Sequence, residues 1–71
     1  MIRILLSIRL GEKRWSQRRL SRETGIDKNT INELYNEWAD RVSLSQIDSI
    51  CNVLGCKLTD ILQREEDQDR R

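Results

Sequence analysis

One segment of the chain carries most of the information about its structure: residues 17–36 read QRRLSRETGIDKNTINELYN. Ser16, just before the segment, is a favourable N-cap, so a short helix is predicted over 17–24. Gly25 can adopt the left-handed conformation that ends a helix, and Asp27 can cap the helix that follows. The segment therefore predicts two short helices joined by a tight turn.

The second of these helices, from Lys28 to about Glu37, divides into two faces. At about 100° per residue, one arc is wholly apolar and the opposite arc carries amides, a lysine and a carboxylate. The apolar arc holds Ile31, Leu34, Tyr35 and Trp38, and the polar arc holds Lys28, Asn29, Asn32, Glu33 and Asn36. Hydrogen-bonding groups of these kinds can contact the edges of DNA bases.

The spacing within this segment is typical of a helix-turn-helix. Two helices of about eight residues that cross near 90–120° need apolar anchors on both helices, a small residue at the turn and an apolar residue just after it. Those roles fall, in the required order, to Leu20, Gly25, Ile26, Ile31 and Leu34.

The flanking segments predict further short helices. Alternating Ile2, Ile4 and Leu6 indicate an extended start. A first helix follows over about 5–14. Trp15 is expected in the core between the first two helices, with stacking on a DNA base as the alternative.

After the segment, Ser43 or Ser45 can cap a fourth helix that ends near Leu54, before Gly55. Its predicted inward stripe is Ile47, Ile50, Cys51 and Leu54, and Leu58, Ile61 and Leu62 suggest a fifth short helix. We expect one all-α domain of about five short helices over 1–63 and a charged, solvated tail over 64–71, with only charged residues and glutamine from Gln63 onward.

The composition argues against catalysis and against a metal site. The 71 residues contain no histidine, three glycines and two cysteines, Cys51 and Cys56. A structural zinc site needs four ligands, so we expect no metal, no cofactor and no enzymatic activity. The two thiols are interpreted as small apolar side chains, with a disulfide as the alternative. No apolar run is long enough to span a membrane, so we expect no membrane partner and a cytoplasmic location.

The charge is distributed unevenly although the net charge is only +1. Residues 1–28 hold eight basic and three acidic side chains, a net charge of +5, and the rest of the chain carries −4. This asymmetry is compatible with an electropositive face that binds phosphates, or with an ordinary solvated surface.

Taken together, these residues resemble the lambda-repressor-like, or Cro-like, helix-turn-helix family, also called the xenobiotic-response-element family. The resemblance covers residues 3 to 62 and rests on Ser16 to Ile26, Thr30-Ile31, Ser43-Leu44, Leu54-Gly55-Cys56 and Asp60-Ile61-Leu62. Ser21 departs from the alanine that the family prefers, and we expect its hydroxyl to bond back to its own helix.

The resemblance implies a DNA-binding transcriptional regulator that places its third helix in the major groove, with the preceding helix across the phosphate backbone. The expected base contacts are Lys28 to guanine, Asn29 and Asn32 to adenine, and Glu33 to cytosine. The expected phosphate contacts are Ser16, Gln17, Arg18, Thr30, Asn36 and Arg41.

Several of these residues have a second interpretation. Asn29 and Asn32 could be ordinary exposed polar residues, and Glu33 could instead pair with Arg18. Tyr35 and Trp38 are interpreted as core or as partner surface, with a backbone contact to DNA as the alternative.

The leading functional prediction is a sequence-specific regulator of bacterial or phage type, a repressor that binds double-stranded DNA and no small-molecule substrate. It is expected to act as a homodimer, because paired half-sites raise affinity. The fourth and fifth helices are the expected dimer surface, since family members often pair there and Val53 lies outside the inward stripe. The alternative is a protein-interaction or antitoxin-like module, suggested by Trp38 and the acidic residues Glu65, Glu66, Asp67 and Asp69.

Overall fold

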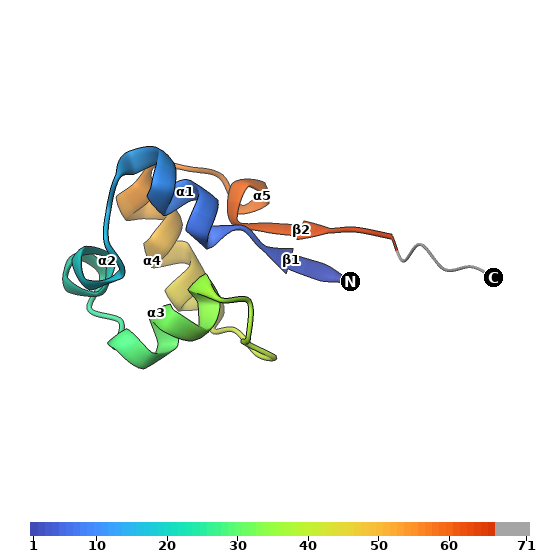
Figure 1. Ribbon diagram of the computed structural model, residues 1–71, viewed down its shortest axis with the longest axis horizontal. Coiled ribbons are helices and arrows are strands. Elements are labelled where there is room, and N and C mark those ends of the chain that lie inside the picture. Colours follow the sequence, from blue (N-terminus) through green and yellow to red (C-terminus); the bar gives the residue numbers. More distant parts are fainter. Residues whose placement is uncertain (67–71) are drawn as a thin grey trace.

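Five helices and two short strands make up the part of the chain that the computed structural model describes, residues 1–66 (Figure 1). The elements are, in chain order, β1 (Ile2–Ile4), α1 (Leu6–Lys13), α2 (Gln17–Thr24), α3 (Lys28–Tyr35), α4 (Leu44–Leu54), α5 (Leu58–Ile61) and β2 (Leu62–Arg64). The predicted five short helices are confirmed.

Three helices begin at the side-chain caps that the sequence predicts. The Ser16 hydroxyl accepts a hydrogen bond from the Arg19 N–H at the start of α2, at 3.0 Å. The Asp27 carboxylate accepts one from the Thr30 N–H at the start of α3, at 3.2 Å. Ser43 caps α4. Each cap supplies an acceptor for a backbone N–H that has no partner within its own helix.

The helix ends differ more from the sequence prediction. Gly25 (φ 77°) and Gly55 (φ 65°) end α2 and α4 in the left-handed conformation, as predicted. Arg14 and Glu37 adopt the same conformation, each at φ 58°, although neither is glycine. The helix predicted to run to Glu37 therefore ends at Tyr35, with Asn36 as its C-cap.

A small antiparallel sheet joins the two ends of the described chain (Figure 1). Ile2 pairs with Arg64 and Ile4 with Leu62. The extended start was predicted, but its partner strand was not. Leu62 leaves the predicted fifth helix and begins β2. Of the predicted tail, Arg64 ends β2, and the Glu65 N–H donates to the Met1 carbonyl at 2.8 Å. Residues 67–71 of that predicted tail lie outside the described residues.

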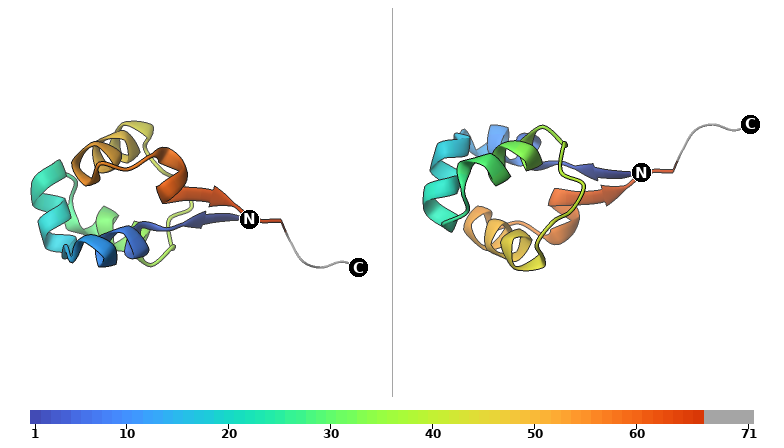
Figure 2. Two further views of the ribbon diagram at one scale, coloured as in Figure 1. Left: turned by 90° about the horizontal axis from the view of Figure 1, so that it is seen from above. Right: turned by 90° about the horizontal axis from the view of Figure 1, so that it is seen from below.

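The core is an apolar cluster to which all five helices contribute. Trp15, Tyr35 and Cys51 are half-buried and pack against it. The buried residues that form the cluster are Ile4, Leu6, Leu10, Leu20, Ile26, Ile31, Leu34, Ile47, Ile50, Leu54 and Ile61. The views in Figure 2 show the helices gathered at one end of the molecule and the strands projecting from the other.

Among residues 1–66, none of the helices has the length and apolar character that crossing a membrane requires.

Candidate nucleic-acid interface

The turn between α2 and α3 is held by hydrogen bonds from α2 to the connecting residues. The Thr24 hydroxyl donates to the Leu20 carbonyl at 2.7 Å and accepts from the Ile26 N–H at 3.2 Å. The Ser21 hydroxyl donates to the Ile26 carbonyl at 2.5 Å. The expected bond from Ser21 back to its own helix is therefore wrong: the hydroxyl bridges the turn, because Ile26 folds inward to the core and brings its carbonyl within reach.

The two faces of α3 lie as the helical periodicity predicts. Ile31 is 0% exposed and Leu34 is 3% exposed. The four expected base-contacting side chains, Lys28, Asn29, Asn32 and Glu33, are all exposed. Their exposure leaves a polar ridge along α3, which we call the α3 ridge.

A pair of amides connects the middle of this ridge to its end. The Asn36 side-chain amide donates to the Asn32 side-chain oxygen at 3.0 Å and to the Asn32 backbone carbonyl at 2.9 Å. The Asn32 oxygen keeps a second lone pair, and its NH₂ group remains available as a donor. Asn32 can therefore still bond to a base in two places, with its amide plane oriented by Asn36.

The expected phosphate-contacting residues lie around the α2–α3 unit and the loop after it. Ser16 is exposed at the start of α2, and Gln17 is half-buried there. Arg18 is exposed, while Thr30 is half-buried in the first turn of α3. The remaining two are exposed near or after the end of α3: Asn36 and Arg41.

The basic residues of the first 28 positions are not all equally available to a ligand. Arg3 pairs with Glu37 and Glu65, and Arg9 pairs with Glu12. Arg19 stacks on Trp15, with its guanidinium carbon 4.1 Å from the ring centroid. The cations that make no ion pair with any described residue are Lys13, Arg14, Arg18, Arg19, Arg22 and Lys28. They all fall between the end of α1 and the start of α3.

Glu33, Tyr35 and Trp38 lie in different surroundings. Glu33 makes no ion pair with Arg18 or with any other described residue. Tyr35 is half-buried against the core, whereas Trp38 is 69% exposed. Trp38 is therefore not a core residue.

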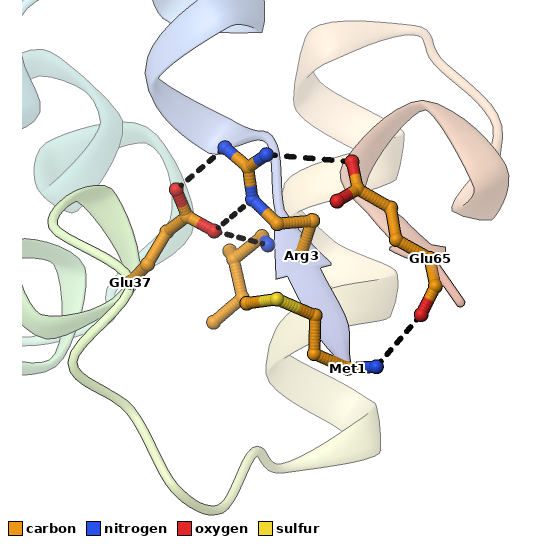
Figure 3. A network of polar contacts seen from close by, with 5 residues as sticks. Met1, Arg3, Glu37 and Glu65 are labelled. Atoms are coloured by element: carbon orange, nitrogen blue, oxygen red, sulfur yellow. Dashed lines mark hydrogen bonds and ion pairs between the residues drawn. The ribbon is translucent and has the colours of Figure 1, made fainter. Parts of the chain in front are cut away.

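Glu37 has a structural role that the sequence pattern did not reveal. Its carboxylate accepts two hydrogen bonds from the Arg3 guanidinium, at 2.8 and 3.0 Å, and one from the Ile4 N–H at 3.1 Å (Figure 3). The hydrogen bonds from Arg3 and from the Ile4 backbone hold the pKa of the Glu37 carboxyl below its usual value. These bonds fix the chain that leaves α3 against β1. No local signal indicates them, because the partners are 33 and 34 residues away.

The two cysteines are free and half-buried at the end of α4. Burial raises the pKa of the Cys56 thiol, and the neighbouring Cys51 raises it further. Cys51 packs against the core, as the interpretation of it as a small apolar residue expects. Among residues 1–66, no cluster of three or more potential metal-ligating side chains is found.

A capped and tightly turned α2–α3 pair, with a buried apolar face and an exposed polar ridge on its second helix, defines a helix-turn-helix DNA-binding domain. Comparison with known proteins specifies the family. Residues 6–67 match the Cro/C1-type HTH DNA-binding domain, and the chain belongs to this family of DNA-binding transcriptional regulators.

Individual proteins of known sequence or known structure are also similar to this chain. YozG of Bacillus subtilis (strain 168), named as an uncharacterized HTH-type transcriptional regulator, is 32% identical over 66 residues, which cover 93% of this chain and 79% of YozG. The crystal structure of a proposed DNA-binding protein from Bacteroides fragilis shares the fold, with a TM-score of 0.79 at 21% identity. That match covers 89% of this chain and 100% of the other. The resemblance expected from the sequence is confirmed.

Proposed function

We propose that the protein is a sequence-specific transcriptional repressor of bacterial or phage type that inserts α3 into the major groove of an operator. The observation that carries the proposal is the α3 ridge, whose four polar side chains are exposed while Ile31 and Leu34 on the opposite face are buried. A helix with this division can enter a groove without exposing its apolar face.

Within the ridge, each side chain suits a different base edge. Lys28 can donate to guanine O6 or N7, and Glu33 can accept from cytosine N4. Asn29 and Asn32 can each bond to adenine in two places. Because Glu33 has no cationic partner among residues 1–66, its carboxylate is free to accept from a base. A good bidentate contact contributes about 1–3 kcal/mol of discrimination.

The phosphate contacts come from the elements that flank the ridge. The first turn of α2 presents backbone N–H groups at its positive end, beside Ser16 and Gln17. Arg18 and Arg41 are exposed cations that can neutralise a phosphate, and Thr30 supplies a hydroxyl in the first turn of α3. Asn36, at the other end of α3, can donate to a phosphate by exchanging one of its amide bonds to Asn32. Such contacts position the protein without selecting a sequence.

The regulatory outcome that follows most directly is repression, because the bound protein covers the operator. The proposed location is the cytoplasm. A domain that occupies an operator blocks access of the transcription machinery without further chemistry. We also propose that the protein binds as a homodimer, because two modules on half-sites about 34 Å apart follow the pitch of the duplex.

Binding to DNA duplexes chosen by in vitro selection tests the proposal. We expect fluorescence anisotropy to show affinity that falls steeply between about 50 and 200 mM salt and that favours the selected sequence. Asn32→Ala should change the preferred sequence, whereas Arg18→Ala should weaken binding to all duplexes by a similar factor. An affinity independent of both salt and sequence would contradict the proposal.

A protein-interaction role remains the second candidate, and Trp38 is the observation that favours it. This indole is 69% exposed directly after the α3 unit, where an aromatic side chain can anchor a protein partner. Glu65, by contrast, is already bonded to Arg3. Affinity capture with the full chain and with Trp38→Ala distinguishes the two, since loss of a partner without loss of DNA binding would indicate a separate interaction surface.

A further inference from the structure

An apolar hollow of about 510 Å³ lies beside the two-stranded sheet, against the loop that follows α3. Its apolar walls include Ile2 and Ile4 of β1, Leu62 of β2 and Val42 of the loop. Two charged side chains, Asp40 and Arg64, also line it. We call this feature the strand hollow.

Part of the apolar lining of the strand hollow lies outside the hydrophobic core and is exposed. Since Ile2 pairs with Arg64 and Ile4 pairs with Leu62, their side chains share one face of the sheet. Ile4 is part of the core and Leu62 packs against it. Ile2, by contrast, is 57% exposed, and Val42 is 39% exposed. A two-stranded sheet is marginally stable by itself. The exposed parts of Ile2 and Val42 leave an apolar surface beside this sheet that a partner can cover.

The charges around the strand hollow indicate what that partner is. Asp40 and Arg64 lie on the same lining, and neither makes an ion pair with another residue among 1–66. In a two-fold symmetric contact, a residue on one copy meets a different residue on the other, and the reverse contact also forms. A patch that carries one acid and one base can therefore be complementary to itself.

We propose that the strand hollow is the homodimer interface and that a second copy of this chain covers it about a two-fold axis. Asp40 of one copy then faces Arg64 of the other, twice, around an apolar centre formed by Ile2 and Val42. The inference deepens the proposed function, on which its relevance to an operator depends.

The location of the strand hollow is compatible with DNA binding by both copies. Figure 1 shows the strands at the end of the molecule opposite α2, and no lining residue belongs to α2 or α3. Covering the hollow therefore leaves the α3 ridge of each copy exposed. A pair of ridges on one assembly is what an operator with two half-sites requires.

The surface expected from the sequence, on α4 and α5, fits a second copy less well. A smaller hollow of about 250 Å³ lies there, lined by Leu44, Ile47, Asp48, Cys51 and Leu58. Its lining contains one acid and no base, so it offers the Asp48 of a second copy no opposite charge. Val53, which suggested this surface, packs against the core instead.

Sedimentation equilibrium of the full chain tests the proposal. Ile2→Glu and Val42→Glu should each weaken the dimer by about tenfold or more, because a carboxylate would be buried in an apolar contact. Leu58→Glu is the matched control on the smaller hollow and should leave the dimer unchanged. Circular dichroism establishes that each variant is folded.

A charge exchange provides a test that does not depend on apolar substitutions. Asp40→Arg and Arg64→Asp should each weaken the dimer, and the double variant should restore it. A wild-type protein that stays monomeric at all concentrations would overturn the proposal, as would a dimer that only Leu58→Glu disrupts or a double variant that dissociates further.

Binding to a duplex with a single half-site separates this inference from the proposed function. A dimer that Ile2→Glu disrupts, in a protein that binds no DNA, would support the interface and contradict the proposed function. A wild-type protein that stays monomeric and binds the half-site would support the proposed function and contradict the interface.

Discussion

The carboxylate of Glu37 accepts two hydrogen bonds from the guanidinium of Arg3, at 2.8 and 3.0 Å, across 34 residues of sequence. The same carboxylate accepts the Ile4 N–H. Glu37 is in the left-handed conformation directly beyond α3, so these bonds stabilise a backbone geometry that a glutamate rarely adopts. They tie the chain that leaves α3 to β1 and direct the loop that lines the strand hollow.

Glu37→Gln should change how stability depends on pH. Because the folded state lowers the pKa of Glu37, its ion pair with Arg3 contributes stability above the ordinary glutamate value of 4.5, and this contribution is lost as the pH falls through the lowered pKa. Urea denaturation from neutral pH down to acid should therefore show the wild type more stable than Glu37→Gln at neutral pH, with the difference shrinking below about pH 4.5.

Glu23→Gln provides the matched control, since Glu23 is exposed and makes no ion pair with a described residue. Its difference from the wild type should change little over the same range. If Glu37→Gln and Glu23→Gln showed the same pH profile, the contact between Glu37 and Arg3 would have no energetic role.

Local signals predicted the side-chain caps of three helices, and two of the four residues with positive φ among residues 1–66. Ser16, Asp27 and Ser43 have short side chains with an oxygen that favours the N-cap position, and Gly25 and Gly55 adopt a positive φ at little cost. Arg14 and Glu37 have neither property. At Glu37 the distant partners in β1 help to stabilise the conformation, and no pattern within α3 reports on them.

The two-stranded sheet is a second feature that local sequence signals predict only in part. Ile2 and Ile4 alternate with polar residues, so the extended start could be predicted. The sequence from Gln63 onward is polar and resembles a tail, yet Leu62–Arg64 forms β2 because β1 supplies backbone partners. Strand pairing between the two ends of a chain is a non-local property that local composition does not contain.

For the site, helical periodicity was sufficient to predict which α3 side chains are exposed. It could not predict the amide pair between Asn36 and Asn32 as a specific bond, and it assigned the Ser21 hydroxyl to the wrong carbonyl. These details depend on rotamers and on how the turn folds inward, not on the spacing of apolar residues.

Gly25→Ala should destabilise the protein by about 1 kcal/mol. Gly25 has φ 77°, and a Cβ added there meets no atom within 4 Å, so the cost comes from backbone conformation and not from a clash. Gly11→Ala is the control: Gly11 lies within α1, with the same open space around it, and alanine there should stabilise the helix by about 0.5–1 kcal/mol. Thermal denaturation of both variants checks the opposite signs, and equal shifts would contradict this account.

Asp27→Ala should reduce the free energy of unfolding by about 1 kcal/mol, because the Thr30 N–H at the start of α3 loses its acceptor. Asp27→Asn keeps a capping oxygen but removes the charge, so it should retain most of the stability. Chemical denaturation measures both. A loss in Asp27→Asn as large as in Asp27→Ala would show that the charge at the positive end of α3 matters more than the cap hydrogen bond.

Asn36→Ala tests whether Asn36 acts on DNA directly or through Asn32. If Asn36 orients the Asn32 amide, its loss should broaden the base preference at the position that Asn32 contacts and weaken the best site by about threefold to tenfold, the equivalent of one hydrogen bond. If Asn36 instead binds a phosphate, Asn36→Ala should weaken all duplexes by one factor and leave the preference unchanged. In vitro selection with the wild type and the variant distinguishes these outcomes. Asn29→Ala serves as the control, because Asn29 lies on the same ridge without a bond to Asn36 and should change the preference at a different base pair.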